Sequence, residues 1–147
     1  MNTADARQLY QDSAVRGASP IELVVVLYDS AIHDMRRALA AIRTGEVETR
    51  ANRIAHALIV LQQLQGTLDF ERGGSAAYQF QQFYNVIRAK VLEAQMRGSW
   101  ELLDQQIRYM SEVRECWMEA KRQLEGSEPV PPTNHDQQRE GRTEWSA

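Results

Sequence analysis

The sequence has only one cysteine, Cys116, and no apolar run long enough to cross a membrane. A single cysteine cannot form an internal disulfide, and a membrane-spanning helix needs about 20 consecutive apolar residues. The N-terminal residues are largely polar and lack the apolar core of a signal peptide. We therefore predict a cytoplasmic protein that does not insert into membranes.

The sequence also lacks an excess of positive charge. It contains 17 Lys and Arg residues against 20 Asp and Glu residues, which gives a net charge of -3 at pH 7. Proteins that bind nucleic acid usually present a strongly basic surface to the phosphates, so this composition predicts no nucleic-acid partner. The 147 residues are enough for one domain that buries its own core without a metal or a disulfide.

Glycine and proline are scarce, with 8 and 4 residues, and they divide the chain into long segments. Within each segment apolar residues recur every three or four positions, which is the period of an amphipathic helix. Short connections between long helices favour antiparallel neighbours, so we predict an all-α, antiparallel four-helix bundle. With their capping residues, the predicted helices cover residues 20–43, 46–68, 75–98 and 99–124.

The two ends of the chain are predicted to differ from the bundle. Residues 4–15 form a short, weakly amphipathic helix that would be marginal alone, within an N-terminal cap segment of residues 1–17. Residues 126–147 begin with a proline cluster and contain few apolar residues, so we predict a disordered tail. The bundle domain then covers residues 1–125.

The first long helix has a well-defined start. Ser19 is a good N-cap, Pro20 suits the first helical position, and Glu22 completes a capping box with Ser19. The residues that follow, 23–28, are apolar all the way round the helix. This helix therefore has more apolar surface than one packing face requires.

The extra surface forms a second stripe of Leu23, Val26 and Leu27, and the second helix adds Ile59 and Val60 outside its main stripe. Such faces are suited to receive an amphipathic helix of a partner in a groove. Two alternatives stay open. The stripes are ordinary core of a wider bundle, or they pair with a second copy of the chain across a two-fold axis.

We find no sequence pattern for catalysis or metal binding. A di-iron bundle needs Glu-x-x-His pairs, but neither His33 nor His56 follows a carboxylate at that spacing, so both are predicted at the surface or a helix edge. Cys116 lacks a local histidine partner and is predicted at the edge of the core. Gly73-Gly74 lacks the strand and lysine of a P-loop and is predicted to be a turn. We therefore predict no enzyme activity, metal or cofactor.

Several short patches occur in a fixed order between residues 10 and 120. Each patch alone is weak, because Ser-Pro is a common helix start and Gly-Gly a common turn. They include Tyr10, Val15, Ser19, Pro20, Leu23, Leu27, Tyr28, Asp29, Ile59, Leu64, Asp69, Gly73, Gly74, Phe83, Tyr84, Arg114 and Trp117. In order and spacing, this set resembles the flagellar secretion chaperone (FliS) family.

The resemblance implies a helical bundle that binds the C-terminal segment of flagellin, blocks its premature polymerisation and delivers it to the flagellar type III export gate. It also implies that the N-terminal segment lies over part of the binding surface in the free protein. We expect a monomer or a weak homodimer. The predicted partner-binding residues are Leu9, Tyr10, Leu23, Val26, Leu27, Ala31, Ile59, Val60 and Leu64, and the predicted structural motif residues are Ser19, Pro20, Tyr28, Asp69, Gly73, Gly74, Tyr84 and Trp117.

Overall fold

The computed structural model describes residues 20–127, and within this range it contains four helices and no strand. This confirms the predicted all-α class. The N-cap residue Ser19 and the predicted binding residues Leu9 and Tyr10 lie outside the described residues, as does most of the predicted tail. The helices are α2 (Pro20–Thr44), α3 (Val47–Gly66), α4 (Phe70–Arg97) and α5 (Trp100–Ser127).

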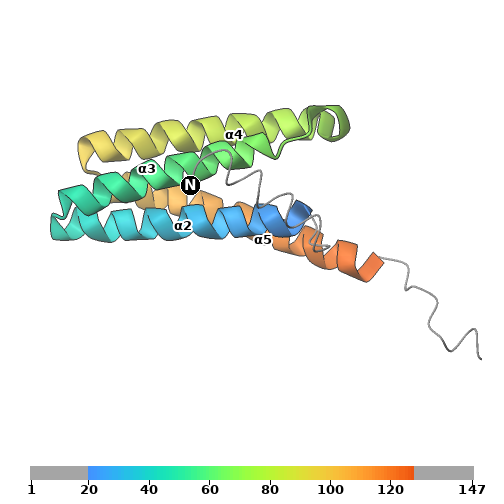
Figure 1. The fold of residues 1–147 in the computed structure, drawn as a ribbon, viewed down its shortest axis with the longest axis horizontal. Helices are drawn as coiled ribbons and strands as arrows, with labels where there is room; N and C mark the ends of the chain where they lie inside the picture. The colour runs from blue at the N-terminus through green and yellow to red at the C-terminus, as the bar shows by residue number, and fades with distance from the viewer. Residues whose placement is uncertain (1–19, 128–147) are drawn as a thin grey trace, which may run out of the picture.

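The four helices form a ring in chain order, in which each packs against its sequence neighbours and α5 returns to pack against α2. The contact between α2 and α3 is the most extensive. Figure 1 shows the helices side by side, with α4 along one edge of the bundle and α2 along the other. Every helix therefore has two neighbours, and α2 and α4 occupy opposite corners of the ring.

The turn between α4 and α5 agrees with the sequence prediction. Gly98 ends α4 with φ 60°, a left-handed conformation that glycine adopts without steric cost. The backbone N–H of Leu102 donates to Ser99 Oγ at 3.2 Å, as expected when Ser99 caps α5. This turn makes α4 and α5 antiparallel neighbours.

The start of α4 and the end of α5 correct two predictions. The helix begins at Phe70 rather than after Ser75, because the side chain of Asp69 accepts hydrogen bonds from the backbone of Glu71 and Arg72. A kink at Gly74, with φ 53° and ψ -130°, is the only trace of the predicted break. At the other end, α5 continues to Ser127, so Gly126 is helical and not the first residue of a disordered tail.

A buried carboxylate joins α2 to α3. Asp34 on α2 is 2% exposed, and it contacts Arg53 Nη1 at 3.4 Å and Nδ1 of His56, both on α3. His33, the neighbour of Asp34, is exposed as predicted. A buried carboxylate is costly unless its oxygens are paired, so Arg53 and His56 hold Asp34 in place and fix the seam between the two helices.

We expect Asp34→Ala to lower the free energy of unfolding by about 1–3 kcal/mol, because it removes the partner of two charged or polar side chains at once. Urea denaturation followed by circular dichroism measures the change. Asp104→Ala is the matched control, because Asp104 pairs with Arg108 on the same exposed face of α5 and such pairs contribute less than about 1 kcal/mol. Equal losses in the two variants would contradict the bridging role of Asp34.

Candidate partner-binding site

The structure places most of the predicted partner-binding residues in the bundle core. Five of them are buried and belong to the main hydrophobic cluster: Leu23, Leu27, Ala31, Val60 and Leu64. Two are at the surface, with Val26 on α2 at 59% exposure and Ile59 on α3 at 37% exposure. The exposed part of the predicted site within residues 20–127 is therefore Val26 and Ile59.

The burial of Leu23 and Leu27, two members of the second stripe, follows from the ring of helices. Because α2 packs against both α3 and α5, it needs apolar side chains in two directions, and Leu23 and Leu27 supply one of them. The alternative that these residues are ordinary core of a wider bundle describes their position. Whether any of them also contacts a partner stays a prediction.

An aromatic cluster lies where α2, α4 and α5 meet. The hydroxyl groups of Tyr28 and Tyr84 form a buried hydrogen bond of 2.8 Å, and their ring centroids are 6.1 Å apart. Phe80 stacks on Tyr84 and lies 5.2 Å from the ring of Trp117 on α5. Burial raises the pKa of both tyrosines above the usual value of 10.0, so both hydroxyls keep their protons into the alkaline range and the hydrogen bond between them is kept.

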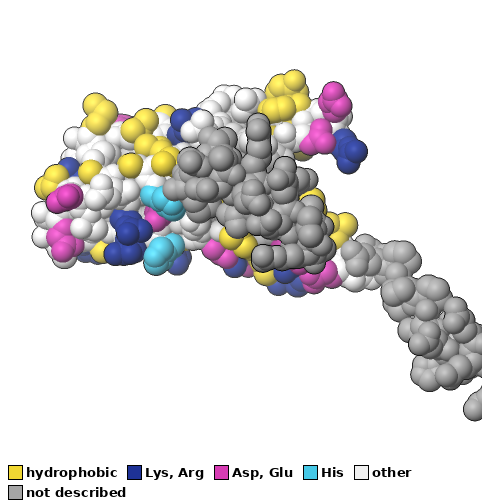
Figure 2. All heavy atoms as spheres, viewed as in Figure 1, with side chains coloured by type: hydrophobic (Ala, Val, Ile, Leu, Met, Phe, Trp, Pro, Cys, Tyr) yellow, Lys and Arg dark blue, Asp and Glu magenta, His cyan; other side chains and the backbone are white. Residues whose placement is uncertain are grey.

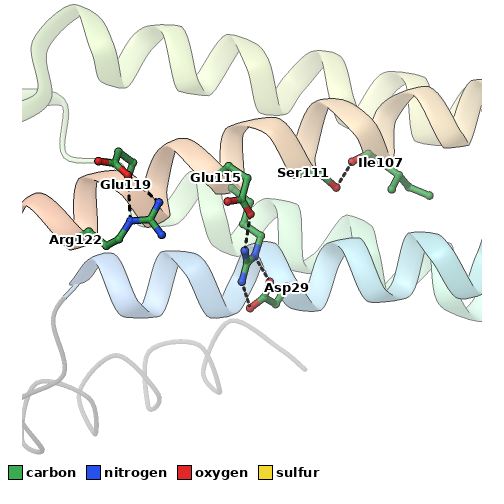
Figure 3. Close-up of polar contacts among 7 residues, drawn as sticks. Asp29, Ile107, Ser111, Glu115, Glu119 and Arg122 are labelled. Atoms are coloured by element: carbon green, nitrogen blue, oxygen red, sulfur yellow. Dashed lines mark hydrogen bonds and ion pairs between the residues drawn. The ribbon is translucent and has the colours of Figure 1, made fainter.

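An ion pair joins α2 to α5 at the surface near this cluster. The guanidinium of Arg114 donates to both carboxylate oxygens of Asp29, and its Nη1 donates to Glu115 Oε1 at 2.9 Å. The hydrogen bond to Asp29 has the largest effect on the pKa of Arg114, which it raises, and the hydrogen bond to Glu115 raises it further. Figure 3 shows Asp29 pointing from α2 toward α5, where Glu115 lies. The pair closes the ring of helices on its outer side.

A shallow groove of about 520 Å³ lies farther along the seam between α2 and α5, with Leu39 and Ile107 among its lining residues. Ser111 also lines it, but its hydroxyl donates to the carbonyl oxygen of Ile107 at 2.7 Å (Figure 3). A nucleophilic serine needs a neighbouring base, and no histidine lines this groove. The groove therefore offers no constellation for nucleophilic catalysis.

The sequence interpretation missed the exposed apolar side chains of α4. The residues of α4 that lie in the core or pack against it recur every three or four positions, as one helix face should: Phe80, Phe83, Tyr84, Ile87, Val91 and Ala94. On the other side, Tyr78 is 62% exposed, Leu92 is 46% exposed and Met96 is 85% exposed. These residues fall outside the core stripe at helical spacing, which is the signal that could have identified them.

A comparison with protein families gives one match that spans nearly the whole chain. The model of the family described as "Flagellar protein FliS" matches residues 2–124. The chain belongs to the FliS family. This family is a chaperone family, in agreement with the predicted resemblance.

Two relatives show how far the similarity extends. The flagellar secretion chaperone FliS of Vibrio cholerae is 26% identical over 125 residues, which is 85% of each chain. The flagellar secretion chaperone FliS of Salmonella typhimurium is 27% identical over 111 residues, or 75% of this chain and 82% of the relative. The FliS-like similarity therefore covers the whole helical bundle.

The FliS-like residues that are far apart in the sequence meet in the structure. Tyr28 contacts Tyr84 across 56 positions, and Asp29 pairs with Arg114 across 85 positions. Trp117 packs at the edge of the same core. Five of the motif residues thus join α2, α4 and α5: Tyr28, Asp29, Tyr84, Arg114 and Trp117.

No helix among residues 20–127 is long and apolar enough to span a membrane.

Proposed function

We propose that this FliS-family protein is a cytosolic export chaperone that binds the C-terminal helical segment of flagellin. By covering that segment it prevents premature polymerisation, and it delivers the subunit to the flagellar type III export apparatus. Membership of the FliS family over residues 2–124 is the observation that carries this proposal. The chemistry is that of binding, since residues 20–127 present exposed apolar side chains such as Val26 and Ile59.

The contact surface in this proposal lies on α2 and α3. Val26 and Ile59 are the exposed members of the predicted site, and Leu23, Leu27 and Val60 are buried in the core of the bundle. An amphipathic helix would place its apolar side chains at positions i, i+3, i+4 and i+7 on such a surface. The predicted contributions of Leu9 and Tyr10 belong to the same proposal.

We expect Val26→Asp and Ile59→Asp each to weaken binding of a flagellin C-terminal peptide by about tenfold or more. Each change removes apolar burial of up to about 1.5–3 kcal/mol and adds the cost of desolvating a carboxylate, and about 1.4 kcal/mol corresponds to tenfold. Isothermal titration calorimetry with the full chain measures the dissociation constant.

The matched control is Met96→Asp, the same type of change at an exposed apolar residue on α4. It should leave the affinity for the flagellin peptide unchanged. Absence of binding by the wild-type chain would contradict the proposed function, whereas equal binding by all variants would contradict only the position of the surface. Concentration-dependent mass without a partner, lost in Val26→Asp, would favour the homodimer alternative.

A further inference from the structure

The helix α4 carries more exposed large apolar side chains than any other helix in residues 20–127. Of the ten large apolar side chains that are exposed in this range, five are on α4. Six residues form one line on this face over five helical turns, and all six are exposed and uncharged. This α4 outer stripe consists of Tyr78, Gln82, Asn85, Ala89, Leu92 and Met96.

The spacing of the stripe shows that it is a single face. Its members follow one another at steps of three or four residues, so they lie above one another along the helix. The residues that α4 buries, such as Ile87 and Val91, fall between these positions and face the core. Figure 2 shows hydrophobic side chains along the edge of the molecule that Figure 1 labels α4.

Positive charge flanks the stripe. Arg88, Lys90 and Arg97 lie on its two sides, and the only carboxylate among residues 76–97 is Glu93. Lys90 Nζ lies 3.2 Å and Arg97 Nη1 lies 3.1 Å from the two oxygens of Glu93, and these contacts lower the pKa of that carboxyl. Arg88 donates to the side-chain oxygen of Gln65, so its charge stays uncompensated. The flanks of the stripe thus carry three cations and one carboxylate.

We propose that the α4 outer stripe is a docking surface for an acidic amphipathic helix of a second protein. The apolar side chains of that helix contact Tyr78, Leu92 and Met96, and its carboxylates meet the flanking cations. A helix laid in this way uses the same i, i+3, i+4 anchors as other helix recognition surfaces. The flanking charges select the sign of the partner and its orientation.

The charges and the polar middle of the stripe argue for this occupant. A second copy of the chain would bring a second set of the same three cations to the interface, so both of its sides would carry an excess of positive charge, which is repulsive. A lipid surface accepts a face that is apolar along its length, whereas Gln82 and Asn85 interrupt this one. Asn85 Oδ1 already accepts from Gln65 Nε2 at 2.6 Å, and an acidic helix offers carboxylates that can accept from the side-chain N–H groups of Asn85 and Gln82.

The stripe lies on a different helix from the surface proposed for flagellin: that surface is on α2 and α3, and α4 packs against α3 but lies at the corner of the ring opposite α2. We expect the two partners to bind at the same time. The expectation of simultaneous binding rests on the proposed function, whereas the proposed docking surface does not. A chaperone with two such surfaces holds its cargo on one side and attaches to an assembly partner on the other.

The test uses two designed helical peptides as probes. Both peptides carry leucines along one helix face, at positions i, i+3 or i+4, and i+7. The remaining positions are rich in Glu in the first peptide, called the Glu peptide, and rich in Lys in the second, called the Lys peptide. In fluorescence anisotropy with the full chain, we expect the Glu peptide to bind about tenfold or more tightly than the Lys peptide, with an affinity that falls as salt is added. Equal binding of the two peptides, or no binding of the Glu peptide, would overturn the proposal.

Substitutions locate the binding. The double variant Leu92→Asp, Met96→Asp should bind the Glu peptide about tenfold or more weakly. The double variant Lys90→Glu, Arg97→Glu should prefer the Lys peptide to the Glu peptide. Val26→Asp is the control on the opposite corner and should leave both affinities unchanged. All these residues are exposed, and thermal melts by circular dichroism verify that the bundle is intact. Loss of Glu-peptide binding only in Val26→Asp would overturn the proposal.

Three further measurements separate the competing occupants. Binding to vesicles of phosphatidylcholine and phosphatidylglycerol without binding to the Glu peptide would assign the stripe to a lipid surface and overturn the proposal. Suppose that the chain self-associates, that the double variant Leu92→Asp, Met96→Asp abolishes the self-association, and that the Glu peptide does not bind. This result would assign the α4 outer stripe to a second copy and overturn the proposal. Displacement of the Glu peptide by the flagellin peptide would overturn simultaneous binding. Failure of the flagellin peptide to bind contradicts only the proposed function, because the Glu peptide still reports on α4.

Discussion

Leu27→Asp should abolish the folded bundle, whereas Val26→Asp, one residue earlier, should leave it folded. Leu27 is 3% exposed and Val26 is 59% exposed, although both lie in the same apolar run. A carboxylate at position 27 loses the burial of a leucine and has no partner, so the combined cost exceeds about 4 kcal/mol. That is a large part of the stability of a typical domain, about 5–15 kcal/mol.

Circular dichroism and urea denaturation of the two variants check this result. A cooperative Leu27→Asp protein whose stability is close to that of Val26→Asp would contradict the position of Leu27 in the core. The comparison also decides how binding assays are interpreted. A loss of flagellin binding in Leu27→Asp reports unfolding, so only substitutions at exposed positions such as Val26 locate the surface.

Tyr84→Ala should lower the free energy of unfolding by about 3–5 kcal/mol. Its ring contacts Tyr28, Phe80 and Phe83, and its hydroxyl is the partner of the buried Tyr28 hydroxyl. The alanine variant therefore creates a cavity and leaves a buried hydroxyl without this partner. Because α4 has fewer buried residues than α2, this contact is a main attachment of α4 to the bundle. Urea denaturation gives the loss, and hydrogen exchange should show the protection of α4 falling first.

Tyr84→Phe is the matched control, because it keeps the ring and removes only the hydroxyl. We expect a loss of about 1–2 kcal/mol, and the double variant with Tyr28→Phe should lose less than the sum of the single changes, since neither hydroxyl is then left alone. The raised pKa of both tyrosines adds a pH test. The two tyrosines should contribute fully to the free energy of unfolding below pH 10.0, the pKa of an unfolded tyrosine, and this free energy should fall as the pH rises above that value. In the double variant the free energy of unfolding should fall less over the same pH range. A Tyr84→Ala loss no larger than that of Tyr84→Phe would contradict the packing role of the ring.

The helices were predictable because their periodicity and their caps agree. The start of α2 at Pro20 and the turn at Gly98 and Ser99 follow from local chemistry that needs no tertiary context. The start of α4 differs from the prediction because Gly73-Gly74 does not end one helix and begin another. Only Gly74 leaves helical geometry, and Asp69 already caps the helix before it.

The exposed and buried faces were harder to predict, because periodicity shows which side chains are apolar but not how many neighbours a helix has. Val26 and Leu27 are both apolar, and they differ by one step of about 100° around the helix. Leu27 lies in the main hydrophobic cluster and Val26 lies outside it, a difference that depends on where the neighbouring helices pack. For the same reason, the exposure of Tyr78 and Met96 can be predicted from the sequence only once the side of α4 that faces the core is known.

The contact between α2 and α5 has a consequence for the order in which the protein assembles during synthesis. The other three helix contacts join neighbours in the chain through short turns, and they can form as soon as each helix leaves the ribosome. The pairing of Asp29 with Arg114 spans 85 positions and must wait for α5. Until then, the side of α2 that α5 covers is open, so the nascent chain exposes apolar surface for most of its translation and hides it only in the last step.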